Sequence, residues 1–208
     1  MTCRILLMRA AESPIRAVPA NEVSCDDVQT VFGTRGQASR CQCQRYKLSP
    51  RESFASFPAE ERAHRLRQQT DCGHPASGTT SGLIAYLDAE PAGWCAVEPR
   101  LAYQGLLRNN RTPWLERAED KSDGTVWALT CFFTRAGFRK RGIGRALARA
   151  AVDHARDRGA RAIEGYPIIT QNVILEELHV GTAGMFADAG FIEVSRPTLR
   201  RVVMRIDF

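Results

Sequence analysis

Lysine is scarce in this chain. Its 208 residues carry 29 Lys and Arg together, but the lysines are limited to Lys47, Lys121 and Lys140. A net charge of +6 would suit a nucleic-acid binder. A cationic set made almost entirely of arginine, beside abundant alanine, is instead typical of a codon-biased genome. We therefore expect no nucleic-acid partner, and an affinity for DNA with strong salt dependence would contradict this reading.

Long apolar runs are also missing. No stretch approaches the roughly 20 apolar residues that a membrane span needs. The opening segment, residues 1–9, holds four apolar residues in a row, which is too short for the core of a signal peptide. The sequence thus predicts no membrane partner.

Cysteine is present, but in an odd and scattered set of seven. This pattern does not suit a disulfide framework and favours a reducing cytoplasm. Cys41-Gln-Cys43 and Cys72-Gly-His74 together offer three sulfurs and one imidazole, which is a legitimate zinc set. Their one-residue spacers are tighter than the usual two to four, so we expect no metal.

The remaining composition, with 44% hydrophobic and 25% charged residues, is that of a globular protein with a core. We expect a single domain over residues 1–208. The expected elements are a strand at 15–19, helices at 24–33 and 58–69, a hairpin of strands at 82–87 and 92–97, a buried strand at 125–134, a helix at 142–158, a strand at 161–166, a helix at 182–189, and strands at 191–194 and 201–206. Residues 34–58 are expected to form an irregular, cysteine-containing insertion, and residues 100–124 a second irregular segment.

One segment indicates chemistry. A buried strand leads into Arg139-Lys-Arg-Gly142-Ile-Gly144-Arg145, and an amphipathic helix begins at once. Glycines there let the backbone approach a ligand, while the free amides and the positive end of the helix dipole favour an anion. The spacing matches neither the Walker loop nor the dinucleotide fingerprint. The segment therefore predicts a cradle for a pyrophosphate.

These residues resemble the GNAT superfamily of acyl-CoA-dependent N-acetyltransferases, whose signature is Arg/Gln-x-x-Gly-x-Gly/Ala. Met185-Phe-Ala-Asp-Ala-Gly190-Phe191 is similar to the closing helix of that family. The resemblance covers about 82–208 well and 15–33 loosely. It implies an α/β fold with a twisted mixed sheet whose fourth and fifth strands splay apart around acetyl-CoA. The residues it assigns to the co-substrate are Phe132, Phe133, Thr134, Arg139, Lys140, Arg141, Gly142, Ile143, Gly144 and Arg145.

Catalytic residues are less clear, because this chain departs from the family. The Tyr that often serves as the acid is replaced by Phe186, and the Asn that often opens the closing helix falls at His179. His179 is our first candidate as proton donor or pantetheine contact, and Tyr166 is the second possible acid. For the base, the buried strand lacks a carboxylate, which leaves Glu164, Glu98 or a chain of water molecules.

Cys131 lies on the same strand, close to the expected pantetheine path. A cysteine nucleophile needs an adjacent base, and strand cysteines are usually small core residues. We therefore expect direct transfer rather than a covalent acyl-enzyme.

The resemblance implies a cytoplasmic, bacterial N-acetyltransferase that acts on a primary amine of a small molecule or peptide, and it admits a homodimer. Acidic residues in the irregular segments are compatible with a cationic amine, including amino-bearing antibiotics: Glu116, Asp120, Glu176 and Glu177. The alternative is a GNAT-fold protein that binds acyl-CoA but catalyses poorly and serves as a sensor or interaction partner. The absence of the Tyr and of a strand-borne Glu favours that alternative.

Overall fold

The computed structural model describes residues 14–109, 111–169, 173–174 and 177–208. Within these residues the strands are β1 (Arg16–Pro19), β2 (Gly82–Leu87), β3 (Glu90–Pro99), β4 (Val126–Thr134), β5 (Ala162–Gly165), β6 (Ile192–Thr198) and β7 (Arg201–Asp207). The α-helices are α1 (Cys25–Phe32), α2 (Gly36–Cys41), α3 (Ala59–Thr70), α4 (Gln104–Leu107), α5 (Ile143–Asp157) and α6 (Ala183–Ala187). Short 3-10 turns are η1 (Ala20–Glu22), η2 (Phe54–Ser56), η3 (Arg100–Ala102), η4 (Ala136–Phe138) and η5 (Glu177–Val180).

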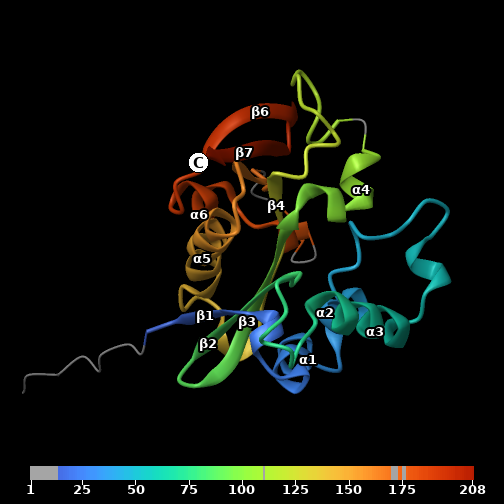
Figure 1. Ribbon diagram of the computed structural model, residues 1–208, viewed down its shortest axis with the longest axis vertical. Helices are drawn as coiled ribbons and strands as arrows, with labels where there is room; N and C mark the ends of the chain where they lie inside the picture. Colours follow the sequence, from blue (N-terminus) through green and yellow to red (C-terminus); the bar gives the residue numbers. More distant parts are fainter. Residues whose placement is uncertain (1–13, 110, 170–172, 175–176) are drawn as a thin grey trace, which may run out of the picture.

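The described strands form one sheet in the order β1-β2-β3-β4-β5-β7-β6 (Figure 1). β4 and β5 run parallel and are joined through α5, whereas the other neighbouring pairs are antiparallel. A parallel pair needs such a helical crossover, while hairpins connect antiparallel neighbours directly. The mixed α/β fold predicted from the sequence is confirmed.

Both faces of the central strands are covered. In β2, Leu83 and Ala85 belong to the core that includes Leu147 of α5, while Ile84 belongs to the core on the opposite face, with Val31 of α1. Strands buried on both sides read as continuous apolar runs rather than as an alternation. The predicted two-sided burial of β4 is confirmed as well, because its residues are buried until its last two positions.

Helix boundaries follow local signals in two places. Ser24 begins α1, and its hydroxyl accepts a hydrogen bond from the backbone N–H of Asp27 at 3.0 Å. α5 ends just before Gly159, whose φ of +75° suits the turn that closes a helix. These are the boundaries that the sequence predicted for the two helices to within about two residues.

The segment 34–58 differs from the expectation of an irregular insertion. It contains α2 and the 3-10 turn η2. Ala38 is the buried residue of α2, and six residues with one apolar anchor show no helical period. The insertion packs with α3 on the α1 side of the sheet, where it forms part of the site described next (Figure 1).

Candidate active site

β4 and β5 pair over a short stretch and then separate. Residues Val126 to Leu129 are partnered with Ala162 to Gly165, and no described residue of β5 continues the pairing. The chain after β5 turns away, because Ile168 forms bridges to Thr182 and Arg201 instead. The second half of β4 therefore has an open edge on this side, as expected for splayed fourth and fifth strands.

A bulge changes the direction of side chains within β4. Ala96 of β3 is opposite Cys131, but the next residue, Val97, is opposite Leu129, so Thr130 is the extra residue. Side chains along a strand alternate between faces, and an extra residue reverses the alternation beyond it. Leu129 lies in the core beside α5, whereas Cys131 lies in the core beside α1 and α2. The bulge thus directs Cys131 toward the cysteine-containing insertion.

The N-terminus of α5 has the features of an anion site. Gly142 precedes the helix with a φ of +82°, a conformation that favours glycine, and no side chain caps the helix. The first helical hydrogen bond runs from the N–H of Ala146 to the carbonyl of Gly142, which leaves the preceding amides of α5 available to a ligand. Exposed cations surround them: Arg139, Lys140, Arg141 and Arg145.

The cations of this loop differ in how they are held. Arg141 pairs with Asp88 at 3.3 Å, and Arg145 forms an ion pair with Asp188 of the α6 turn. Both arginines are about half-exposed or more, so these pairs contribute little to stability and can rearrange around a phosphate. The loop is therefore a cationic rim around the end of α5.

A pocket of about 830 Å³ lies along the open edge of β4. It shares Thr134, Phe138, Gly144, Thr182 and Met185 with a smaller pocket of about 200 Å³ around Gly142 and Arg145. The two pockets thus form one groove from the end of α5 toward α1 and α2. Of the residues predicted for acetyl-CoA, those that line at least one of the pockets are Phe132, Phe133, Thr134, Arg139, Lys140, Gly142, Ile143, Gly144 and Arg145.

The larger pocket has a cationic far end. Arg35 precedes α2 and Arg45 follows it, and both line the pocket, whose described lining includes no carboxylate. This differs from the expectation that acidic loop residues face the acceptor. Glu177 pairs with Arg200 at 2.9 Å, and neither Glu116 nor Asp120 lines the pocket. Glu176 lies outside the described residues.

His179 lines the larger pocket from η5. Its half-buried ring lies 6.2 Å, centroid to centroid, from the ring of Tyr46, which holds one side of the imidazole against protein. Imidazole is the side chain best suited to giving or taking a proton near neutral pH, which makes its place on the pocket wall relevant to catalysis. Of the four predicted catalytic residues, His179 is the one that lines the pocket.

Phe186 is fully buried and belongs to the core. The centroid of its ring lies 5.8 Å from that of Phe132 and 4.9 Å from that of Phe191, and both pairs are in edge-to-face geometry. A Cβ on Gly165 would lie 2.0 Å from the Phe186 ring, so the glycine makes room for it. The aromatic group at this position fixes the end of β5 against α6 and supplies no proton.

Tyr166 and Glu164 are bonded to each other rather than open to the pocket. The hydroxyl of Tyr166 donates to Oε2 of Glu164 at 3.0 Å. Both side chains are fully buried, and neither lines either of the two pockets of the groove. Burial chiefly raises the pKa of Tyr166, with the neighbouring negative charge of Glu164 adding to it. Their position argues against the predicted roles as acid and base.

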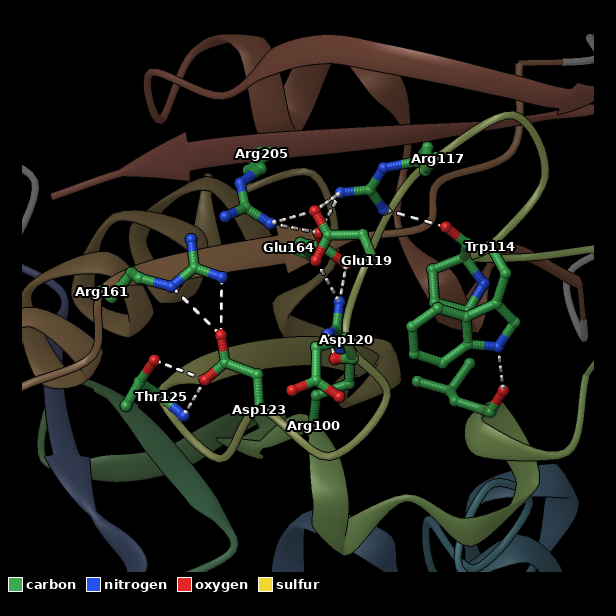
Figure 2. A network of polar contacts seen from close by, with 12 residues as sticks. Arg100, Trp114, Arg117, Glu119, Asp120, Asp123, Thr125, Arg161, Glu164 and Arg205 are labelled. Atoms are coloured by element: carbon green, nitrogen blue, oxygen red, sulfur yellow. Dashed lines mark hydrogen bonds and ion pairs between the residues drawn. The ribbon is translucent and has the colours of Figure 1, made fainter.

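Three arginines surround Glu164 (Figure 2). Arg100 donates to Oε2 at 3.1 Å, Arg205 donates to Oε1 at 2.7 Å, and Arg117 also donates to Oε1. Burial opposes the charged carboxylate, but the hydrogen bond and charge of Arg117, the charge of Arg100 and the hydrogen bond from Arg205 outweigh it and lower the pKa of Glu164. Glu119 accepts from the same arginines. The network ties β5 and β7 to the segment 100–120.

Glu98 is a different kind of carboxylate. Its side chain, 13% exposed, lies at the end of β3 and forms an ion pair with the Lys47 ammonium. Burial raises the pKa of Glu98 despite the opposing charge of the Lys47 ammonium. The hydroxyl of Tyr103 is also buried, and it has no hydrogen-bond partner among the described residues. Glu98 lines neither pocket of the groove, although its strand, β3, pairs with β4.

Five of the six described cysteines fall into two groups. Cys25 and Cys72 form a disulfide, which the scattered set of seven did not predict. Cys41, Cys43 and Cys131 line the larger pocket as free thiols, together on the wall beside α2. Cys72 is therefore unavailable to the zinc set considered from the sequence, and His74 pairs with Asp71 at 2.8 Å. Within the described residues, no three His, Cys, Asp or Glu side chains are placed to share a metal ion.

Sequence reasoning missed two sets of pocket residues. Arg35 and Arg45 flank a helix too short to be predicted, and the Cys41-Gln-Cys43 pair was considered only as a metal ligand set. No local signal marks the second set, because Cys43 and Cys131 are 88 positions apart in the sequence. No helix in the described part of the chain has the length and apolar character required to cross a membrane.

Comparison with known proteins agrees with this geometry. The family model described as the Acetyltransferase (GNAT) family matches residues 45–178. No curated protein matches the chain. Because the family model covers more than half of the sequence, the protein belongs to the GNAT acetyltransferase family, a family of acyltransferases.

Solved structures share the fold. A structure of YncA, a putative acetyltransferase from Salmonella typhimurium with its cofactor acetyl-CoA, has 12% identity and a TM-score of 0.53, covering 93% of each chain. An acetyltransferase of the GNAT family from Streptococcus pneumoniae has 14% identity and a TM-score of 0.51, covering 93% of this chain and 99% of that one. The PaiA N-acetyltransferase from Thermoplasma acidophilum in complex with coenzyme A has 14% identity and a TM-score of 0.50, covering 94% of this chain and 99% of that one.

Proposed function

We propose that this protein transfers an acetyl group from acetyl-CoA to a primary amine of a small molecule or peptide by direct transfer. The observation that carries the proposal is the groove, in which the N-terminus of α5, preceded by Gly142 and not capped by a side chain, opens into a pocket along the free edge of β4. Structural neighbours that contain acetyl-CoA or coenzyme A support the choice of co-substrate.

The shape of the groove fits this co-substrate. The amides of residues 143–145, with the surrounding cations, suit the pyrophosphate. A Cβ on Gly144 would lie 2.9 Å from the Met185 sulfur, so the second glycine of the motif keeps this part of the groove open. The backbone of Phe132, Phe133 and Thr134 lines the way into the larger pocket and suits the peptide-like pantetheine arm.

His179 is our candidate for the acid. Direct transfer requires a proton on the thiolate as it leaves, and a positioned donor contributes about 10² to 10⁴ in rate. His179 lines the pocket, whereas Phe186 has no proton and Tyr166 is bonded to Glu164 in the core. The proton for the leaving thiolate therefore comes either from His179 or from solvent.

Glu98 is our candidate for the final acceptor of the proton lost by the amine. A carboxylate with a raised pKa is a stronger base than an ordinary one. Glu98 has such a pKa through burial, and it lies on β3, opposite Ala128 of β4. Glu164 does not suit this role, because its hydrogen bonds from arginine stabilise the anion and make it a weak base.

The acceptor we propose carries a negative group near its amine, such as a carboxylate. Arg35 and Arg45 line the far end of the pocket, and the described lining offers no carboxylate to pair with a cation. A polycationic antibiotic would meet like charges there, which is unfavourable. This replaces the cationic acceptor that the acidic loop residues indicated in the sequence.

A CoA-release assay against matched amines tests the function. Each pair contains an amino acid or dipeptide and the corresponding amine without the carboxylate, and a polyamine is tested as a third class. The released CoA is measured by chromatography, because protein thiols would react in a colorimetric thiol assay. Turnover of the carboxylate-bearing member of each pair is the expected result. Turnover confined to polyamines would contradict the acceptor class, and absence of CoA release from all of them would contradict the transfer reaction.

A protein that binds acyl-CoA without efficient catalysis is the second candidate. The burial of Phe186 at the position of the family acid, and the engagement of Glu164, favour it. It predicts acetyl-CoA binding without CoA release in the same assay. The cytoplasmic location, bacterial source and homodimer stay predictions.

A further inference from the structure

Two thiols from distant parts of the chain meet in the pocket wall. The sulfur of Cys43 lies 2.8 Å from the sulfur of Cys131, although the residues are 88 positions apart. Both are buried free cysteines, and neither has a role in the proposed acetyl transfer. Two sulfur atoms at this separation need only a small movement to reach the S–S bond length of about 2.05 Å.

The backbone fixes Cys43 in this position. Gln42 and Cys43 have φ angles of +47° and +50°, which a residue with a side chain adopts only when its surroundings require it. The amide side chain of Gln44 holds the turn by donating to the carbonyl of Gln42 at 3.1 Å and to Oε1 of Gln69 at 2.8 Å. The turn thus points one thiol toward β4 from an anchored segment.

β4 fixes the other thiol. The bulge at Thr130 places Cys131 on the face toward α1 and α2, where an unbroken strand would have placed it on the opposite face. Trp94 of β3 completes the site, because its indole N–H donates to the Cys43 sulfur at 3.0 Å. Three independent features, the turn, the bulge and the indole, therefore converge on one sulfur pair.

We propose that Cys43 and Cys131 form an oxidisable dithiol that closes to a disulfide in the wall of the acceptor pocket. With a peroxide as the oxidant, one thiolate attacks the peroxide oxygen, the O–O bond breaks, and a sulfenic acid forms as hydroxide leaves and is protonated to water. The second sulfur then attacks the sulfenic sulfur, loses its proton, and releases a second water. Two S–H bonds and one O–O bond are lost, one S–S bond forms, and two electrons pass to the peroxide.

Closure would tie the α2 side of the pocket to β4. Burial raises the pKa of Cys43, with the hydrogen bond to Cys131 adding to it, so its thiol is neutral near pH 7. The attacking species is the thiolate. Attack on the peroxide by Cys43 is therefore expected to be slow at neutral pH and to accelerate as the pH rises toward that pKa.

Peptide mapping of the full-length protein tests the proposal directly. Trypsin releases Cys41 and Cys43 together in residues 41–45 and Cys131 in residues 122–135. After treatment with hydrogen peroxide, we expect these two peptides joined, and separated again by dithiothreitol. The link should persist in Cys41→Ser and in the control Cys95→Ser, whose buried thiol faces α5 instead. It should be lost in Cys43→Ser.

Three results would overturn the proposal: no joined peptide from the wild-type protein, a disulfide confined to residues 41–45, or loss of the link in Cys41→Ser, which would assign the bond to Cys41. The wild-type map does not depend on whether any variant folds. The Cys25–Cys72 disulfide serves as an internal reference for recovery of linked peptides in the same digest.

Discussion

The hydroxyl of Tyr166 donates a hydrogen bond to Oε2 of Glu164 at 3.0 Å, so the two residues that the sequence offered as an acid and a base are partners in the core. Arg100 and Arg205 complete the surroundings of that carboxylate. Buried ion networks hold elements together, and their removal exposes uncompensated charge. The network thus holds this end of β5, and neither Tyr166 nor Glu164 lines the groove.

Glu164→Gln should destabilise the fold by about 3 kcal/mol, because it removes the central anion and leaves buried arginines without compensation. Urea unfolding measures the change. The matched control is Glu193→Gln, which breaks the exposed pair with Arg196 and should cost less than about 1 kcal/mol. Equal stability of the two variants would contradict the structural role of the network.

His179→Ala should lower kcat at least about tenfold, a loss of about 1.4 kcal/mol of transition-state stabilisation, and leave the Kd of acetyl-CoA near the wild-type value. Steady-state kinetics with an active acceptor, combined with calorimetry, measures both. A raised KM for acetyl-CoA with unchanged kcat would make His179 a binding contact. No change in either would transfer the role of the acid to solvent.

Arg45→Gln should raise the KM for a carboxylate-bearing acceptor about tenfold, because it removes one of the two cations at the far end of the pocket. Arg51→Gln is the control, since Arg51 is exposed in the same segment and does not line the pocket. If Arg45→Gln instead weakens acetyl-CoA binding and spares the acceptor KM, this arginine belongs to the co-substrate site.

The free energy of unfolding should decrease in acid, because folding opposes protonation of His154. Burial, together with the charge of Arg158, lowers the pKa of His154 from an ordinary value of 6.5 to about 4. Between about pH 6.5 and pH 4 the unfolded chain binds a proton at this histidine and the folded protein does not. The free energy of unfolding is therefore highest above about pH 6.5 and decreases as the pH falls toward about 4. The loss is on the order of 3 kcal/mol. Unfolding titrations across this range should show a decline that is smaller in His154→Leu.

The sequence was informative wherever a local signal coincided with a structural need. β4 is an apolar run, α5 has a helical period, and the glycines between them mark the place where a backbone needs an unusual φ, as Gly142 has. Ser24 and Gly159 set helix ends for the same local reasons. Each of these features is determined by residues within a few positions in the sequence, so the sequence alone could predict it.

The pocket wall could not be predicted, because its determinants are distant in sequence. Cys43 meets Cys131 across 88 positions, and the bulge that allows it leaves no mark in the apolar run of β4. α2 is too short for a period, so Arg35 and Arg45 could not be assigned to the pocket. Composition likewise gives the number of carboxylates but not their direction, and Glu164 therefore looked as available as Glu98.

Calorimetric titration of acetyl-CoA into Gly142→Asp tests the central claim most directly. The substitution places a side chain and a negative charge at the N-terminus of α5, so the Kd should rise at least about tenfold over the wild-type value. Gly142→Ala separates charge from backbone strain, and Gly78→Asp, at an open loop position, controls for added charge. Both should bind more tightly than Gly142→Asp, and Gly78→Asp should match the wild type. Unchanged acetyl-CoA affinity in a folded Gly142→Asp protein would contradict the assignment of this groove to the co-substrate.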